Sequence, residues 1–461
     1  MRLRLLIIAI VIVGVSAQAA VPVAQRGAQQ AARKPNVVLI IMDDMGYGDI
    51  GSYGVTDART PNLDRLAREG VRLTDAYANG AVCTPTRTAL ISGRYQQRVG
   101  LERALNAADQ ELGLPVTGTS LPALLKKTGY ITGLIGKWHL GFKPEFGPNA
   151  HGFDEFFGFL SGAVDYYTHQ RGDGTHDLYE NTTPVETPNY LTDEITRRAV
   201  SFIDRRSASP FFLEVAYNAV HWPFQPPDRP PSRADRSAPP RPQATGDARL
   251  FQGPDDPAPA TRQDYVRMLE RADAGVGVIL AALDRHTLSK DTLVIFTNDN
   301  GGEWLSRNAP LSHRKATLWE GGIRVPLIVR WPARLPAGKT SEQVAITMDL
   351  TASILAATAS AVPPGHRLEG IDILPILRGD SSLTDRQLFW RIAQPNRQQR
   401  AVRVGQWKLL VDGGQFLLFD VRADPGERQD LAARRPELVV KLKALLQEWE
   451  KDVDQKPQPS Q

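Results

Sequence analysis

The chain has 461 residues, of which 42% are hydrophobic and 23% are charged. These shares are typical of soluble globular proteins and exclude a disordered, collagen-like or low-complexity chain. The formal net charge is only +4, so the composition predicts neither a nucleic-acid-binding surface nor a strongly basic membrane clamp. We therefore expect any preference for anionic ligands to come from a local site.

The amino-terminal segment has the pattern of an export signal. Arg2 and Arg4 precede an apolar run, and the A-x-A sequence at residues 17–19 is typical of a cleavage site. The alternative is a membrane anchor, for which the apolar run is too short. We predict a signal peptide over residues 1–20, a linker over 21–33, no stable membrane anchor, and a periplasmic or secreted protein.

From Pro35 onward, apolar β-branched runs alternate with helical patterns. The runs predict buried parallel strands, and Pro at the start with Gly at the end predicts helices between them. The expected strands are 37–42, 131–135, 211–216 and 293–297, and the expected helices are 61–70, 86–93 and 120–129, the last with Ser120 as its N-cap. The alternation predicts an α/β fold with a mostly parallel sheet covered by helices on both faces.

The carboxy-terminal region has a different pattern. Strand-like segments at 401–412 and 416–420, followed by a charged helix at 436–451, predict a small antiparallel sheet with one helix. The expected domains are a catalytic domain over 34–382, with a long surface loop at 223–262, and a carboxy-terminal subdomain over 383–461.

Polar residues follow two of the expected strands. Asp43 and Asp44 come directly after the first strand, and Asp299 and Asn300 come shortly after the strand at 293–297. In open parallel sheets, ligands bind outside the carboxyl ends of the strands, so these residues are expected at one edge. Either pair alone has the simpler explanation of a turn. Together they form a hard-oxygen set typical of Ca²⁺ or Mg²⁺ sites.

Cationic residues follow other expected strands. Lys137 and His139 are two residues apart, so in an extended segment both point to one side. His221 follows the strand at 211–216. A lone histidine in a loop is more often structural than catalytic. Here, however, a purely structural role would have to hold independently for residues at several strand ends. Together with Arg87 and Lys315, these residues predict a pocket for a tetrahedral dianion, a sulfate ester or a phosphate ester.

Cys83 is the single cysteine of the chain, so no internal disulfide is possible. Its neighbours are mostly polar, which disfavours a cysteine in an apolar core. It precedes an expected helix, whose amino terminus lowers the pKa of a nearby thiol. A thiolate beside a hard-oxygen metal site would nevertheless be unusual.

Several motifs together carry a family resemblance. Cys83-Thr84-Pro85-Thr86-Arg87, continuing as TALISGRY, resembles the C-x-P-S-R signature of the formylglycine-dependent (type I) sulfatases, in the alkaline phosphatase superfamily. Thr86 stands where the family usually has Ser. Further stretches resemble the family in the same order, from about Pro35 to the carboxy terminus: PNVVLIIMDDMGYGDIGSYG, GYITGLIGKWHLG, HGFDEFFGF, TNDNGGE, WEGGIRVPLIVRWP and LFDVRADPGERQDLA.

The resemblance implies the family fold, a large mixed, mostly parallel sheet flanked by helices with a smaller carboxy-terminal sheet and helix. It also implies that a maturation enzyme oxidises Cys83 to formylglycine (3-oxoalanine), whose hydrated aldehyde is the nucleophile. One calcium ion would be held by the side chains at five positions: Asp43, Asp44, Cys83, Asp299 and Asn300.

Roles for the remaining site residues also come from the resemblance. Arg87 would stabilise the hydrated aldehyde, and Lys137 would bridge it to the sulfate. His221 and Lys315 would bind sulfate and assist the leaving oxygen, and His139 would take the proton when sulfate is eliminated. A serine often lies near the sulfate in this family, and Ser161 is the nearest candidate, although its spacing fits poorly.

The resemblance predicts an enzyme that hydrolyses sulfate esters, of sulfated carbohydrates or aryl sulfates. One alternative is a formylglycine-dependent phosphonate or phosphodiester hydrolase, because both kinds of ester present tetrahedral anions. Another is an exported, calcium-dependent glycan-binding protein with a decayed site. The sequence identifies neither the sugar nor the position of the sulfate.

Overall fold

The computed structural model describes residues 34–229 and 260–455. The expected signal peptide and linker, and most of the expected loop at 223–262, lie outside the described residues. Among the described helices, none is long and apolar enough to cross a membrane.

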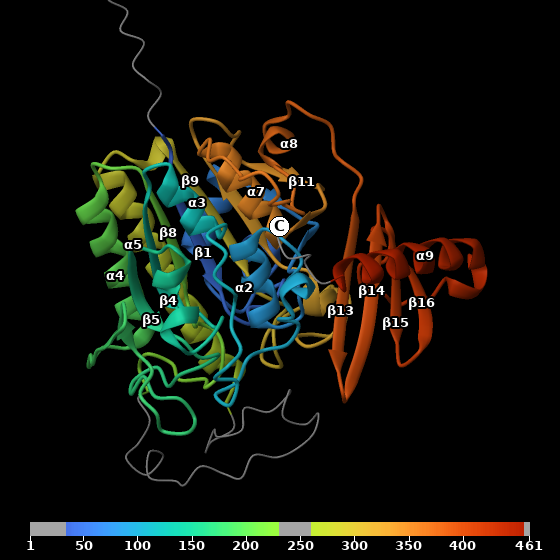
Figure 1. The fold of residues 1–461 in the computed structure, drawn as a ribbon, viewed down its shortest axis with the longest axis horizontal. Helices are drawn as coiled ribbons and strands as arrows, with labels where there is room; N and C mark the ends of the chain where they lie inside the picture. The colour runs from blue at the N-terminus through green and yellow to red at the C-terminus, as the bar shows by residue number, and fades with distance from the viewer. Residues whose placement is uncertain (1–33, 230–259, 456–461) are drawn as a thin grey trace, which may run out of the picture. The chain divides into compact units, whose positions relative to one another are not determined.

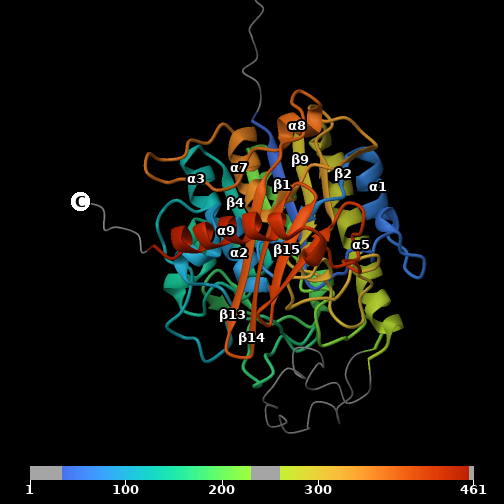
Figure 2. The same ribbon diagram turned by 90° about the vertical axis from the view of Figure 1, so that its right-hand side faces the viewer.

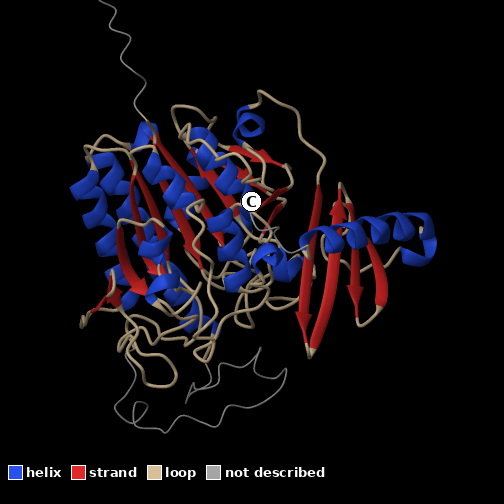
Figure 3. Ribbon diagram, in the orientation of Figure 1, coloured by secondary structure: helices blue, strands red, loops and turns tan. Residues whose placement is uncertain are grey.

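A mixed sheet of ten strands forms the centre of the described chain, with helices on both of its faces (Figures 1 and 3). Its strand order is β11-β2-β10-β9-β1-β8-β4-β5-β6-β7. The strands are β1 (Asn36–Met42), β2 (Val71–Leu73), β4 (Ile131–Lys137), β5 (Glu155–Phe159), β6 (Tyr179–Glu180), β7 (Thr183–Pro184), β8 (Phe211–Ala216), β9 (Thr292–Asn298), β10 (Leu327–Arg330) and β11 (Lys339–Ser341). β3 (Ala76–Tyr77) and β12 (Ala345–Ile346) pair separately.

Strand β1 lies at the middle of the sheet and pairs in parallel with both β8 and β9. Ile41 lies opposite Ala216 on one side and Thr297 on the other. This register brings the carboxyl ends of all three strands to one edge, so the residues that follow them meet there. β10 runs antiparallel to β9, which makes the sheet mixed.

All seven side chains of β1 are buried because helices cover both sides of the sheet. Val38, Ile40 and Met42 pack in one apolar cluster, and Val37, Leu39 and Ile41 pack in another on the opposite face. The first cluster includes residues of α1 (Pro61–Glu69), α4 (Leu191–Arg206) and α5 (Arg262–Arg285). The second includes residues of α2 (Cys83–Ser92), α3 (Leu121–Lys127), α7 (Thr347–Ala357) and α8 (Leu374–Arg378).

The carboxy-terminal region forms a four-stranded antiparallel sheet (Figure 2). Its elements are β13 (Gln387–Gln394), β14 (Arg397–Val404), β15 (Trp407–Asp412), β16 (Gln415–Asp420) and the helix α9 (Pro436–Val453). Leu442, Leu446 and Trp449 recur every three or four residues and line the buried side of α9. They belong to an apolar cluster that also contains Tyr77 of β3 and Ile346 of β12. The carboxy-terminal sheet is thus packed onto the part of the chain that precedes it.

The predicted fold class is confirmed, with two local corrections. Ser120 is the N-cap residue of α3, as expected, but its hydroxyl donates to the carbonyl of His151 at 2.6 Å and makes no capping bond to the helix. The helix expected at 86–93 begins earlier, at Cys83. Pro85 falls in its first turn, where a missing backbone N–H costs nothing.

Candidate active site

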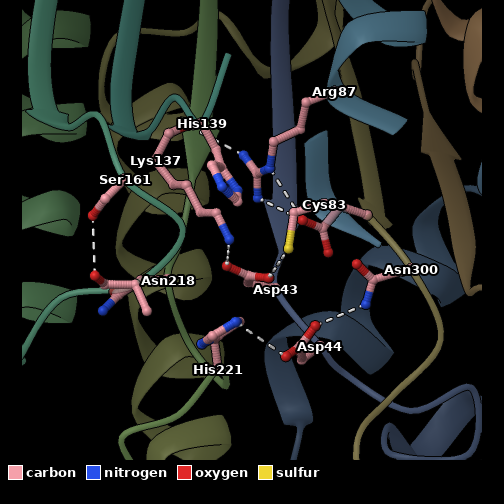
Figure 4. A network of polar contacts seen from close by, with 12 residues as sticks. Asp43, Asp44, Cys83, Arg87, Lys137, His139, Ser161, Asn218, His221 and Asn300 are labelled. Carbon is pink, nitrogen blue, oxygen red and sulfur yellow. Dashed lines mark hydrogen bonds and ion pairs between the residues drawn. The ribbon is translucent and has the colours of Figure 1, made fainter. Parts of the chain in front are cut away.

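The polar residues expected at the strand ends gather at the carboxyl edge of the main sheet, and their side chains point toward a common space (Figure 4). Asp43 and Asp44 follow β1, Asp299 and Asn300 follow β9, and Lys137 is the last residue of β4. The site is completed by Cys83 and Arg87 of α2 and by loop residues His139, His221 and Lys315.

Cys83 is the first residue of α2, and its Sγ lies 3.6 Å from Oδ1 of Asp43. It is only 3% exposed, yet it faces charged groups and not the apolar core. Burial, and then the negative charge of Asp43, raise the pKa of the thiol. The expectation that the helix terminus would lower this pKa is therefore wrong, since desolvation is the largest effect on the thiol and raises its pKa. An unmodified Cys83 is a poor nucleophile at this position.

Two threonines hold the start of α2 in place. The hydroxyl of Thr86 accepts from the N–H of Gly80 at 3.0 Å and donates to the same residue's carbonyl at 3.1 Å. The hydroxyl of Thr84 donates to the carbonyl of His139 at 3.0 Å and accepts from the N–H of Leu105 at 3.1 Å. Thr86 thus keeps the hydroxyl that a serine would supply, and the departure from the family motif leaves the hydrogen-bonding group intact.

Asp43 and Lys137 form a completely buried ion pair, with Lys137 Nζ 2.5 Å from Oδ2 of Asp43. Burial and the neighbouring charge of Asp299 nevertheless raise the pKa of Asp43 to about 7. Because burial is the largest cause, the charged form of Asp43 is costly here despite its lysine partner. A divalent cation would stabilise that charged form.

Asp44 has three partners. Lys315 Nζ lies 2.6 Å from its Oδ2, His221 Nε2 lies 3.4 Å from the same oxygen, and the Asn300 amide donates to its Oδ1 at 2.7 Å. Burial acts to raise the pKa of Asp44, but the charge of Lys315 holds it below its ordinary value. Asp44 is therefore ionised at neutral pH.

The donor set fits a hard cation. Ligand atoms of Asp43, Asp44, Cys83 and His221 lie within 4.8 Å of one another. The side-chain oxygens Oδ1 of Asp299 and of Asn300 are buried and have no hydrogen-bond partner among the described residues. Buried oxygens are normally partnered, so these unpaired atoms beside two carboxylates suit an oxygen-coordinated ion such as Ca²⁺.

His139 has a defined tautomer. Its Nε2 lies 2.8 Å from the carbonyl of Leu105, which can only accept, so the ring proton is on Nε2. Burial and the nearby charge of Lys137 lower the pKa of His139 far below its ordinary value, and its Nδ1 has no partner among the described residues. A neutral imidazole with a free lone pair is a proton acceptor. The backbone at His139 has a φ of 61°, so the extended geometry expected between Lys137 and His139 is wrong.

His221 has the opposite tautomer to His139, with its ring proton on Nδ1. Its Nδ1 donates to the carbonyl of Trp222 at 2.6 Å, and its Nε2 lies 3.2 Å from Nζ of Lys315. Burial lowers the pKa of His221, so its Nε2 accepts from the lysine. This pairing leaves the proton on Lys315.

The carboxy-terminal sheet holds the segment that carries Lys315. Arg397 donates to the carbonyl of Ala316 at 2.7 Å, and the side chain of Gln399 accepts from the N–H of Leu318 at 2.8 Å. The N–H of Lys315 itself donates to the carbonyl of Gly302 at 3.1 Å. Residues distant in sequence thus fix one wall of the site.

The sequence assigns no role to two further residues at the site, Asn218 and Glu303. Asn218 is 2% exposed, and neither polar atom of its side chain has a partner among the described residues. Glu303 is 5% exposed, and burial, together with the charge of Asp44 and against that of Lys315, raises its pKa to about 8. Their signal was position alone: Asn218 follows a strand, and Glu303 ends the stretch TNDNGGE. Ser161 is buried and donates to the carbonyl of Ala163 at 3.0 Å.

Buried carboxylates and cations at the carboxyl edge of a helix-covered, mostly parallel sheet fit the class of hydrolases that act on anionic esters. The sequence pattern of the Sulfatase family matches residues 35–360, and that of "N-sulphoglucosamine sulphohydrolase, C-terminal" matches residues 312–452. The chain belongs to the sulfatase family and is an enzyme that hydrolyses sulfate esters, as predicted.

Individual relatives agree with this assignment. N-acetylgalactosamine-6-sulfatase of Canis lupus familiaris is 35% identical, over 83% of this chain and 72% of that protein. Arylsulfatase A of Bos taurus is 33% identical, over 89% and 82% of the two chains. The crystal structure of Ps i-CgsB in complex with k-i-k-neocarrahexaose has a TM-score of 0.81 and 31% identity, over 92% and 94% of the two chains. None of these relatives supports the phosphonate or phosphodiester alternative.

Proposed function

We propose that this sulfatase acts through formylglycine made from Cys83, with Ca²⁺ held by Asp43, Asp44, Asp299 and Asn300. The observation that carries the proposal is the position of Cys83 Sγ, 3.6 Å from a carboxylate oxygen of Asp43 at the start of a helix. The raised pKa of the thiol supports the same conclusion, because the unmodified side chain would stay protonated.

Calcium and the modified residue would each supply one part of the chemistry. Bound Ca²⁺ would stabilise the charged form of the buried carboxylates and polarise a sulfate oxygen. Formylglycine, once hydrated, would supply an oxygen nucleophile compatible with that ion, in place of a soft sulfur. In the calcium site, residue 83 would then be an oxygen ligand.

Arg87 and Lys137 would orient the nucleophile and bind the sulfate. Arg87 is anchored on Asp299 by two hydrogen bonds and on the carbonyl of Lys137 by a third, at 3.1 Å. These three bonds fix the guanidinium of Arg87 near the side chain of residue 83 (Figure 4). The fully buried ammonium of Lys137 can bind negative charge strongly, since water does not screen it.

His139 and the Lys315–His221 pair would handle the protons of the reaction. Nδ1 of His139 is available to accept a proton from the hydroxyl of residue 83 when sulfate leaves. Lys315, which holds its proton against Nε2 of His221, is available to donate toward the leaving oxygen. One acceptor and one donor are what the two halves of such a reaction require.

We infer that the substrates are sulfated carbohydrates or aryl sulfates. The named relatives include an N-acetylgalactosamine-6-sulfatase and an arylsulfatase, and Ps i-CgsB was solved with a neocarrahexaose bound. These names support both classes of leaving group.

We also propose a cellular location, a maturation partner and domain boundaries for the chain. The chain would be exported after loss of residues 1–20, act in the periplasm or as a secreted protein, and depend on a formylglycine-generating maturation enzyme. The catalytic domain would comprise residues 34–382, preceded by the linker 21–33 and followed by the subdomain 383–461.

The test is sulfate release from a panel of sulfated saccharides and aryl sulfates. The enzyme would be produced together with a maturation enzyme, and Cys83→Ala would be the matched control. Release by the wild type that disappears in the control supports the proposal. Equal release by both proteins would contradict a nucleophile at residue 83.

A further inference from the structure

Thr84 directly follows the proposed nucleophile in the sequence, and its side chain takes no part in the proposed reaction. It is the second residue of α2 and is completely buried. Its hydroxyl makes one hydrogen bond to the backbone of His139 and one to the backbone of Leu105, which lie 55 and 21 residues away. A single side chain thus ties helix α2 to two loops that are distant in the sequence.

Thr84, His139 and Leu105 close a cycle of three hydrogen bonds. The hydroxyl of Thr84 donates to the carbonyl of His139 at 3.0 Å, and the N–H of Leu105 donates to that hydroxyl at 3.1 Å. Nε2 of His139 completes the cycle by donating to the carbonyl of Leu105 at 2.8 Å. All three residues are buried, so water does not compete for these bonds. Each bond therefore restrains the geometry of the other two.

The ring of His139 has little room to move within this cycle. A Cβ atom at Gly162 would lie 2.7 Å from Cε1 of the ring, so the ring packs directly against the backbone of Gly162. The backbone of His139 has a φ of 61°, which is uncommon for a residue with a side chain, and the bond from Thr84 to its carbonyl helps to hold it. Packing thus fixes the direction of the ring, and what remains to be set is which ring nitrogen carries the proton.

The carbonyl of Leu105 sets the position of that proton. A neutral imidazole carries one proton on either nitrogen, and a carbonyl oxygen beside Nε2 keeps it there. Nδ1, which has no partner among the described residues, is then the free acceptor. Leu105 lies in a segment, residues 101–120, that contains no helix or strand. The position of its carbonyl therefore depends on side-chain contacts such as the bond from the Leu105 N–H to Thr84.

We propose that Thr84 is a positioning residue for His139: its hydroxyl holds the carbonyl of Leu105 against Nε2 and so keeps Nδ1 free to accept a proton. Because Thr84 adjoins residue 83, one turn of helix carries both the proposed nucleophile and the support of its proton acceptor. This inference rests on the proposed function, in which His139 accepts the proton of residue 83. The tautomer of His139 can nevertheless be measured without any turnover.

The first measurement is the tautomer of His139. Nitrogen NMR spectra of the protein with isotope-labelled histidine and added Ca²⁺ separate protonated from unprotonated ring nitrogens, and the signals of His139 are those that disappear in His139→Gln. We expect a proton fixed on Nε2 in the wild type and in Thr84→Ser, and signals shifted toward protonation of Nδ1 in Thr84→Val. Thr84→Ala, which removes the same hydroxyl and adds no methyl group in its place, serves if Thr84→Val does not fold. An unshifted tautomer in the variants without the hydroxyl would overturn the proposal.

The second measurement is kcat and KM for sulfate release, with kcat expressed per molecule converted at residue 83, as counted by mass spectrometry. We expect Thr84→Val to lower kcat by about 10-fold to 100-fold and to leave KM within about twofold, because the base is misplaced while the substrate does not touch Thr84. Thr84→Ser should restore kcat to within about threefold of the wild type, since it keeps the hydroxyl.

Thr358→Val is the matched control. Thr358 directly follows α7, is buried, and donates its hydroxyl to the carbonyl of Ile354 at 2.8 Å. Its replacement should lower stability and leave kcat unchanged. An unchanged kcat in Thr84→Val, an equal fall in Thr84→Ser, or an equal fall in the control would each overturn the positioning role. A wild type that releases no sulfate would instead contradict the proposed function, and the NMR comparison would still test the role of Thr84.

Discussion

Arg87 makes two hydrogen bonds to Oδ2 of Asp299, from Nε at 3.1 Å and from Nη2 at 2.9 Å, and both side chains are almost completely buried. The pair joins the helix that begins at Cys83 to the end of the central strand β9. A guanidinium fixed in this way has a defined direction, which a flexible lysine would not have. The position of residue 83 relative to the carboxylates therefore depends on this pair.

Replacing Arg87 by lysine should lower both activity and stability. Lysine keeps the charge but cannot reproduce the two-pronged contact with Asp299. Removing one partner of a buried ion pair altogether costs about 3–5 kcal/mol, which is the upper limit for the loss of stability in this variant. We expect kcat/KM to fall by about 100-fold and unfolding to occur at lower denaturant concentration. Arg65→Lys, at a half-exposed ion pair on α1, should change neither quantity measurably. Wild-type kinetics in Arg87→Lys would contradict the orienting role.

Calcium should stabilise the folded enzyme. An ion that binds only the folded state adds about 2.7 kcal/mol at a concentration 100 times its Kd. Chelation should thus lower the melting temperature and abolish sulfate release, and added Ca²⁺ should restore both. Asp299→Asn should lose most of the calcium-dependent thermal shift, whereas Asp291→Asn, at an exposed residue, should keep it. A melting temperature that ignores both chelator and Ca²⁺ would rule out the metal site.

The lowered pKa of His139 should set the acidic limb of the pH profile of activity. Its neutral form must accept the proton, and burial places its pKa far below 6.5. Activity should therefore persist as the pH falls through 6.5 and decline only at lower pH. His139→Ala should lower kcat by about 100-fold to 10,000-fold with a smaller effect on KM. A wild-type kcat profile, measured at saturating Ca²⁺ so that Asp43 stays ionised, that loses half its value near pH 6.5 would disagree with this assignment.

Glu214 should make stability depend on pH. It lies on β8, its Oε2 has no partner among the described residues, and burial raises its pKa from 4.5 to about 7, with Arg87 opposing the shift. Between pH 4.5 and 7 the folded state therefore binds more protons than the unfolded state, and stability falls as the pH rises.

Glu214→Gln should remove this loss, so that its free energy of unfolding relative to the wild type increases across that window by roughly 3 kcal/mol. Denaturant titrations at several pH values measure the difference. Glu186→Gln, at an exposed position, is the control. A pH-independent difference between Glu214→Gln and the wild type would mean that Glu214 is ionised throughout.

The sequence predicted the parts of the site that follow from sheet geometry. Asp43, Asp44, Asp299 and Asn300 were identified because parallel strands end at one edge, and the register of β1 with β8 and β9 brings them there. The raised pKa of Cys83 could not be predicted in this way, because it depends on how completely α2 is packed.

Other features depend on contacts between distant segments. The tautomer of His139 is set by the carbonyl of Leu105, 34 residues away. The segment that carries Lys315 is held by Arg397, which donates to the carbonyl of Ala316, 81 residues away in the sequence. No local pattern encodes either contact.

Mass spectrometry of the peptide that carries residue 83 shows whether that residue is formylglycine. Protein made with a maturation enzyme and protein made without it would be compared, with sulfate release measured on the same two samples. We expect an aldehyde in place of the thiol at residue 83 in the first sample, and release in proportion to the converted fraction. Full release from a sample in which Cys83 is entirely unmodified would contradict it.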